Sequence, residues 1–300
     1  MPSQQPFRFG IVRNQTLPWP VLADHARRFE ACGFESLWLS DHFQRPSGPD
    51  EPLLEGWTTL AALAATTERL RLGILVTSNT FRNPALVVKE AVTVDHVSRG
   101  RVEVGLGTGW YKGEHDRVGL PFPEPPELVD RFEEAVQIVD LMLRQKTTTF
   151  KGAYYTLEDA LCHPLPIQQP RPPITLGAHG PRMLRIAARY ADRWNSYGSV
   201  AEIQDRNTRL DEACAAIGRP PGEIIRSFFG MAPRLTMAGR LPTDPWASPD
   251  AFGEAVELYR AVGINEFLVD GPEPHQLDVM ERIASDVLPR FRTSKASRDV

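Results

Sequence analysis

Residues 70–115 read LRLGILVTSNTFRNPALVVKEAVTVDHVSRGRVEVGLGTGWYKGEH. Within them, residues 72–76 form a short β-branched and aliphatic run, long enough for a buried strand and too short for a helix. Asn83 is a favoured N-cap residue, and Pro84 stands at the first helical position, which tolerates the missing N–H. Valines and alanines then recur at helical spacing until Gly100. This half of the stretch predicts a strand, a loop and a helix.

A second strand pattern follows at once in residues 101–107 and ends in the turn Gly107-Thr108-Gly109. Because glycine has no Cβ, such a turn lets the backbone approach a ligand closely. The whole stretch therefore predicts a βαβ unit with a ligand-ready turn at the carboxyl end of its second strand. That is the local architecture of an enzyme.

The same alternation continues along the chain. The remaining strands are expected at residues 7–12, 36–40, 174–177, 193–196, 224–229 and 267–270, and the remaining helices at 19–31, 58–67, 128–143, 181–191, 201–217, 252–262 and 276–287. Eight strands alternating with eight helices, without a shift in composition, favour one closed α/β (β/α)₈ TIM barrel over 1–300. A doubly wound parallel sheet is the competing architecture.

Several segments lie outside this alternation. Loop insertions are expected after strands two, four and seven, at residues 43–55, 110–126 and 231–248, and a small β excursion at 147–157 with a turn at Gly152. Five prolines between residues 164 and 173 predict a connector without regular structure. The polar tail 291–300 is expected to be loose.

Composition narrows the class of protein. The net charge of −4 and the scattered lysines and arginines argue against a nucleic-acid partner. No apolar run approaches the roughly 20 residues that a membrane span needs. The three cysteines are far apart and fit a reduced compartment, and the N-terminus has no signal-peptide pattern, so we expect a cytoplasmic protein.

In a barrel of this kind the active site lies where strands end and helices begin. The second strand ends in Asp41-His42, and a histidine there can reach a bound ring and exchange a proton near neutral pH. The alternative is a hydrogen-bonded structural histidine. Trp110, after the glycine turn, is either a stacking lid over a planar ligand or an anchor of its loop.

A candidate anion site follows the fifth strand. Gly177-Ala178-His179-Gly180 precedes a helix whose free N–H groups and positive dipole end favour an anion, with Arg182 close in sequence. The competing interpretation is that these glycines only form an ordinary turn between a strand and a helix. Other site classes have less support: the sequence has no metal-binding spacing and no G-x-S-x-G elbow, and the glycine turn does not open a helix as a dinucleotide-binding turn would.

The chain resembles the luciferase-like monooxygenase superfamily, and within it the oxidoreductases that use the deazaflavin coenzyme F420. The resemblance covers nearly the whole chain. It is carried by SDHF at residues 40–43, the block 72–110, EHDRVGLPFP at 114–123, the block 150–180 and AARYADRWN at 187–195. The resemblance implies a (β/α)₈ barrel, a small-molecule substrate and a homodimer.

The resemblance also implies roles for individual residues. His42 would exchange the proton and Asp41 would orient it, while Trp110 and Phe43 would shape the apolar side of the pocket. The third strand would carry a non-proline cis peptide against the cofactor ring. The implied cofactor-binding residues are Leu75, Val76, Thr77, Gly107, Thr108, Gly109, Trp110, Gly177, Ala178, His179, Gly180 and Arg182.

Two departures from the family pattern stand out. Sugar-phosphate dehydrogenases of this family carry an acidic residue after the strand-four glycines, and this chain has Trp110 there. The phosphate turn is G-A-H-G instead of G-G-x-G. The expected activity is hydride transfer between the deazaflavin and an unidentified small organic substrate. The alternatives are a flavin mononucleotide (FMN)-dependent monooxygenase and a flavin- or deazaflavin-binding protein without catalysis.

Overall fold

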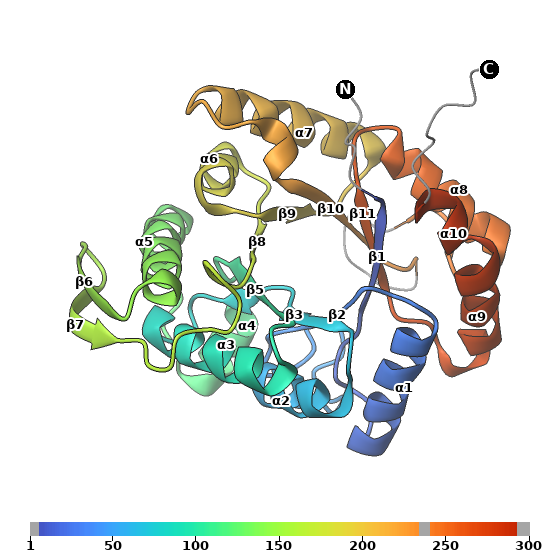
Figure 1. Cartoon of the computed structure of the whole chain (residues 1–300), viewed down its shortest axis with the longest axis horizontal. Coiled ribbons are helices and arrows are strands. Elements are labelled where there is room, and N and C mark those ends of the chain that lie inside the picture. The colour runs from blue at the N-terminus through green and yellow to red at the C-terminus, as the bar shows by residue number, and fades with distance from the viewer. Residues whose placement is uncertain (1–5, 234–240, 293–300) are drawn as a thin grey trace.

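The computed structural model describes residues 6–233 and 241–292. Within them, parallel strands close into a barrel of eight strand positions surrounded by helices, which confirms the predicted (β/α)₈ architecture (Figure 1). The barrel strands are β1 (Arg8–Val12), β2 (Ser36–Leu39), β3 (Arg71–Ile74) with its continuation β4 (Thr77–Ser78), β5 (Val102–Gly107), β8 (Ile174–Gly177), β9 (Arg193–Ser196), β10 (Ile225–Gly230) and β11 (Glu266–Asp270). Pairing of β1 with β11 and of β3 with β5 closes the ring.

Helices follow the strands on the outside of the barrel (Figure 1). They are α1 (Trp19–Ala31), α2 (Gly56–Thr66), α3 (Pro84–Ser98), α5 (Pro125–Arg144), α6 (Pro181–Tyr190), α7 (Val200–Ala215), α8 (Pro249–Arg260) and α9 (Leu277–Asp286). The predicted start of α3 is confirmed, because the Asn83 side chain accepts a hydrogen bond from the Ala85 N–H and Pro84 opens the helix. None of the helices in the described residues has the length and apolarity needed to cross a membrane.

Some elements differ from the sequence prediction. A short helix, α4 (Lys112–Val118), lies inside the segment expected to be a loop. The hairpin of β6 (Thr147–Lys151) and β7 (Thr156–Leu161) runs four residues past the expected end. At the C-terminus, α10 (Leu288–Arg292) includes the first two residues of the expected tail, and 293–300 lie outside the described residues, as do 234–240 of the third insertion.

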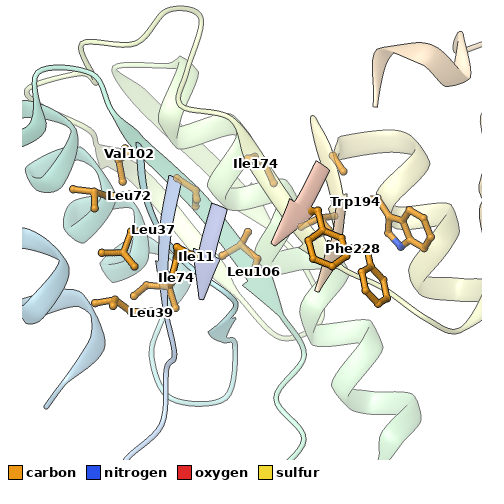
Figure 2. Packing of buried hydrophobic residues seen from close by; sticks show 14 of the residues in the cluster. Ile11, Leu37, Leu39, Leu72, Ile74, Val102, Leu106, Ile174, Trp194 and Phe228 are labelled. Carbon is orange, nitrogen blue, oxygen red and sulfur yellow. The ribbon is translucent and has the colours of Figure 1, made fainter. Parts of the chain in front are cut away.

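The main core lies between strands and helices. Leu37 pairs in register with Leu72 on the neighbouring strand, and Leu39 with Ile74, so side chains two residues apart face the same layer (Figure 2). All four side chains are fully buried. This packing fixes the register of β2 and β3, and hence the position of the residues that follow them.

Inside the barrel, Trp38 occupies space that two glycines leave open. A Cβ at Gly73 would lie 2.4 Å from the Trp38 ring, and one at Gly105 would lie 1.9 Å from the Ile74 carbonyl oxygen. No side chain larger than hydrogen fits at either position. The glycines of β3 and β5 are therefore packing residues.

The amino-terminal end of the barrel is filled by charges. The fully buried Arg193 guanidinium pairs with Glu103 and, at 2.7 Å, with Glu266, and Glu103 also pairs with Arg71. Burial alone would lower the pKa of Arg193, but the two carboxylates raise it. A cavity of about 550 Å³ opens beside this cluster. Polar groups at this end of a TIM barrel serve stability, and chemistry belongs to the opposite end.

Candidate active site

A cavity of about 390 Å³ lies at the carboxyl ends of the strands and is called here the C-terminal cavity. Among the predicted site residues, its wall contains Asp41, His42, Leu75, Val76, Gly109, Trp110, Gly177 and His179. Of the others, Thr77, Gly107, Thr108, Ala178, Gly180 and Arg182 lie outside the wall that the described residues form. The structure thus brings together predicted residues from four separate strand ends.

His42 is held in place by a carboxylate that the sequence prediction missed. Its Nδ1 lies 2.8 Å from Oε1 of Glu114, whose Oε2 accepts a hydrogen bond of 2.9 Å from the Phe43 N–H. Glu114 is 1% exposed. A carboxylate that already accepts one N–H acts as the acceptor for Nδ1–H too, so Nε2 is the nitrogen of His42 that can exchange a proton.

Asp41 has a different role from the predicted one. Its carboxylate accepts bonds of 2.7 and 3.0 Å from both terminal nitrogens of Arg82, and one of 2.8 Å from the Ser78 N–H. A bidentate pair of this kind fixes both side chains. The prediction that Asp41 orients His42 was wrong because Glu114 takes that place. Asp41 instead ties the end of β2 to β4 and to the loop before α3.

Glu114 reaches the cavity because α4 is anchored from its other side. The neighbouring His115 is fully buried, with Nε2 2.6 Å from Thr80 Oγ1 and Nδ1 2.9 Å from the Tyr111 carbonyl oxygen. Its ring also packs against Phe81, with ring centres 4.9 Å apart. These contacts hold the short helix that carries Glu114. In the sequence, the only signal of this site was an acidic residue next to a histidine, Glu114-His115, between Gly113 and Gly119.

The floor of the cavity is the irregular segment between β3 and β4. The Leu75-Val76 peptide bond is cis, as the resemblance implied, and both residues line the cavity. Gly177 faces them: a Cβ at this position would lie 3.4 Å from Val76 Cγ2. The missing side chain leaves a shallow cradle over Val76. Gly107, whose Cβ would lie 2.4 Å from the same methyl group, lies behind Val76 and supports it.

The predicted anion site is only partly at the cavity. His179 lines it and packs edge-on against Tyr197, with ring centres 4.4 Å apart. Burial, and then the nearby Arg206, lower the pKa of His179 to about 4, so this imidazole is neutral at physiological pH. Arg182 points elsewhere: its guanidinium is 44% exposed and pairs with Asp130 on α5. The backbone at the start of α6 remains the predicted anion-binding element.

Trp110 stands at the mouth of the cavity. Its side chain is 56% exposed, its ring lies edge-on to His42 with centres 5.9 Å apart, and Tyr111 packs beside it at 5.4 Å. Both lid and anchor were considered from the sequence, and the large exposed area argues against a simple anchor. An aromatic surface therefore lies next to the histidine that can exchange a proton.

Comparison with known proteins places the chain in a family. The model of the luciferase-like monooxygenase family matches residues 6–232, and the chain belongs to this family. An F420-dependent glucose-6-phosphate dehydrogenase of Intrasporangium calvum is 30% identical, with 90% of this chain and 94% of the relative covered. The enzyme of the same name from Microbacterium testaceum is 33% identical over 96% of this chain and 98% of its own.

A solved structure supports the fold. The coenzyme F420-dependent tetrahydromethanopterin reductase of Methanopyrus kandleri superposes with a TM-score of 0.81 at 20% identity, covering 95% of this chain and 99% of that one. At this level of identity the likeness speaks for the barrel and not for the substrate.

Proposed function

We propose that the protein is a coenzyme F420-dependent oxidoreductase that transfers a hydride between the deazaflavin and a small organic substrate. Relatives that share a third of the sequence over nearly the whole chain carry this activity in their names. The observation that carries the proposal is the buried Glu114 holding His42 at the wall of a cavity at the catalytic end of the barrel.

The residues of the C-terminal cavity fit a flat ring with an anionic tail. Leu75 and Val76 offer an apolar floor, and the Cβ-free Gly177 leaves room above Val76 for a planar group. Just beyond the wall residue His179, helix α6 begins at Pro181, and its first backbone N–H groups are suited to an anion. We propose that these elements hold the coenzyme, with Thr77, Gly107 and Ala178 supporting the wall from behind.

When bound, the coenzyme supplies hydride transfer, and the protein supplies orientation and the proton. His42 Nε2 takes the proton from a substrate hydroxyl in oxidation, or returns one to a carbonyl oxygen in reduction. Glu114 keeps Nδ1 protonated during both directions and stabilises the imidazolium that forms in the first. Trp110 and Tyr111 shield that exchange from water at the mouth.

A titration separates this proposal from its rival. Purified protein is titrated with coenzyme F420 and with FMN while fluorescence quenching is recorded. Binding of F420 supports the proposal, whereas micromolar binding of FMN without binding of F420 would replace it with a flavin-dependent monooxygenase. Loss of turnover in His42→Ala, with coenzyme binding kept, tests the proton role. Coenzyme binding without turnover of any substrate would leave a binding protein.

We also propose that the protein is a cytoplasmic homodimer and that the whole chain acts as one domain. The described cysteines are all free thiols, which fits a reducing compartment. On α3, Leu86 and Val97 are 50% and 42% exposed, and a subunit contact would cover them. Light scattering coupled to gel filtration measures the mass directly, and a monomer would contradict the dimer.

A further inference from the structure

The cavity of about 550 Å³ at the amino-terminal end of the barrel, called here the N-terminal cavity, has no part in the proposed function. Its wall is formed by the starts of several strands, the end of α5 and the proline-rich connector. Five arginines belong to this wall: Arg8, Arg71, Arg144, Arg171 and Arg193. Each guanidinium carries five N–H donors and no acceptor. The carboxylates around them decide how many of these donors are left for a ligand.

The innermost charges form one layer inside the barrel. Because side chains alternate along a strand, Arg8 is on the same face of β1 as Val12, which packs in the barrel interior against Trp38 and Leu268. The other charged members of this layer come from near the starts of β3, β5, β9 and β11, and they are Arg71, Glu103, Arg193 and Glu266. In this layer, three guanidinium groups therefore share two carboxylates.

Both carboxylates are committed to the other two arginines. Glu103 binds Arg71 with Oε1 and Arg193 with Oε2, and Glu266 Oε2 lies 2.7 Å from Arg193 Nε. Arg8 stands in register with Glu266 on the neighbouring strand. Within residues 6–233 and 241–292, however, its guanidinium makes neither an ion pair nor a hydrogen bond. Arg8 is thus a half-buried cation without a counter-ion, which is an unfavourable state for a charge partly removed from water.

The carboxylates in the outer part of the wall are committed as well. Each is paired with an arginine, in the pairs Glu35–Arg292, Glu223–Arg219 and Asp192–Arg171. Arg144 donates from Nε to Asp140 at 3.0 Å, and the described part of the chain gives its two terminal nitrogens no hydrogen-bond acceptor. The wall thus has N–H donors to spare while its carboxylates are occupied, so an occupant of the cavity has to bring the acceptor oxygens and the negative charge.

We propose that the N-terminal cavity is a second ligand site, which binds the carboxylate or phosphate group of a small metabolite. Arg8 supplies the uncompensated charge and Arg144 supplies further N–H donors from the same wall. Arginine binds both kinds of oxyanion through paired N–H donors. The cavity is larger than such a group, so the rest of a small molecule has room beside it. The site lies at the opposite end of the barrel from the C-terminal cavity and does not depend on the proposed function. An anion bound there stabilises the folded chain, because the unfolded chain lacks the site.

Titration with two simple anions tests the site on the full-length protein. Inorganic phosphate and acetate are titrated separately by calorimetry at neutral pH, with sodium chloride keeping the ionic strength constant. We expect saturable binding of at least one of them at millimolar concentrations, where phosphate has little general stabilising effect on proteins. The same anion should raise the midpoint of urea unfolding. The anion with the higher affinity tells whether the natural ligand carries a phosphate or a carboxylate.

Two variants locate the binding. Arg8→Gln removes the uncompensated charge, so the affinity should fall by about tenfold or more. In buffer without either anion, this variant should be at least as stable as the parent, because the half-buried charge is gone. Arg209→Gln is the matched control: Arg209 is exposed on α7 and pairs with Asp205, and its variant should bind the anion as the parent does.

Three results would overturn the inference. The first is the absence of saturable binding of both anions. The second is binding that survives Arg8→Gln, which would place the anion elsewhere, for example at the start of α6. The third is a loss of stability in Arg8→Gln without any anion, which would make Arg8 a structural residue. All three leave the coenzyme titration untouched, so failure of this site and failure of the proposed function are distinguishable.

Discussion

Replacing Glu114 by glutamine tests whether His42 depends on its buried carboxylate. The carboxylate accepts two bonds, of 2.8 Å with His42 Nδ1 and 2.9 Å from the Phe43 N–H. A glutamine amide has one acceptor and one donor end, so it satisfies only one of these N–H groups. With the oxygen kept on Phe43, the NH₂ group faces Nδ1 and moves the histidine hydrogen to Nε2. The ring then presents a donor where the reaction needs an acceptor.

The size of the effect follows from the role that is lost. General acid–base catalysis by one positioned group contributes about 10²–10⁴-fold, so we expect kcat of Glu114→Gln to fall by that range. This corresponds to about 3–5 kcal/mol of activation free energy. The opposite amide orientation leaves two N–H groups facing each other and costs about 1–3 kcal/mol, so it does not rescue the enzyme.

The assay separates chemistry from folding and binding. Turnover is measured at saturating F420 and substrate, coenzyme affinity by fluorescence quenching, and stability by urea unfolding. Asp116→Asn is the matched control, because Asp116 lies on the same helix but is exposed and pairs with Lys112 at 2.7 Å; its turnover should equal that of the parent. A Glu114→Gln enzyme with the turnover of the parent, or one that loses coenzyme binding in proportion to activity, would refute the tautomer argument.

Three further predictions concern packing, pH and the coenzyme. Gly105→Ala should lower the free energy of unfolding by about 1–3 kcal/mol or more in urea denaturation, because the new methyl group would lie 1.9 Å from the Ile74 carbonyl oxygen; equal stability would contradict the packing. Burial raises the pKa of Glu90 to about 7 despite Arg82, so the folded state binds the extra proton between the unfolded value of 4.5 and about 7, and that stability is lost as pH rises through 7. Glu90→Gln should therefore be more stable than the parent at pH 8, on the order of 1–2 kcal/mol, and gain little at pH 5; a gain that is the same at both pH values would contradict the pKa shift. Gly177→Val should weaken F420 binding at least about tenfold with an unchanged unfolding midpoint, since its branched side chain would fill the cradle; unchanged affinity would place the ring elsewhere.

The barrel was predictable because most of its strands and helices can be recognised from the few residues that form and bound each of them. The buried strand β3 belongs to a short aliphatic run, and α3 has its cap and first-turn proline in sequence. Those signals need no knowledge of distant residues. Once the alternation predicts a barrel, the carboxyl ends of the strands meet at one end, and this is why residues as far apart as His42 and His179 could be assigned to one cavity.

The pairing of charges could not be predicted in the same way. Asp41 and His42 are adjacent in sequence, yet their partners are Arg82, from the loop before α3, and Glu114, from helix α4. Helix α4 escaped prediction because its seven residues carry no apolar stripe: its buried side chains are polar, and tertiary hydrogen bonds hold them. Spacing in the sequence predicts a helix only when apolar residues recur at helical intervals. Helix α4 has no such recurrence, because its two buried side chains are polar and adjacent in sequence.

Trp110 and Glu114 together distinguish this site from that of the sugar-phosphate dehydrogenases of the family. The resemblance leads one to expect an acidic residue directly after the glycine turn, where its carboxylate would face the substrate. Here that position is the exposed Trp110, and the nearest carboxylate lies four residues later, with one oxygen at His42 and the other at the Phe43 N–H. A carboxylate held in this way orients a histidine but does not meet the substrate itself. In the proposed mechanism, proton exchange therefore passes through His42, and the position of the family's acidic residue is taken by an exposed aromatic side chain at the mouth of the cavity.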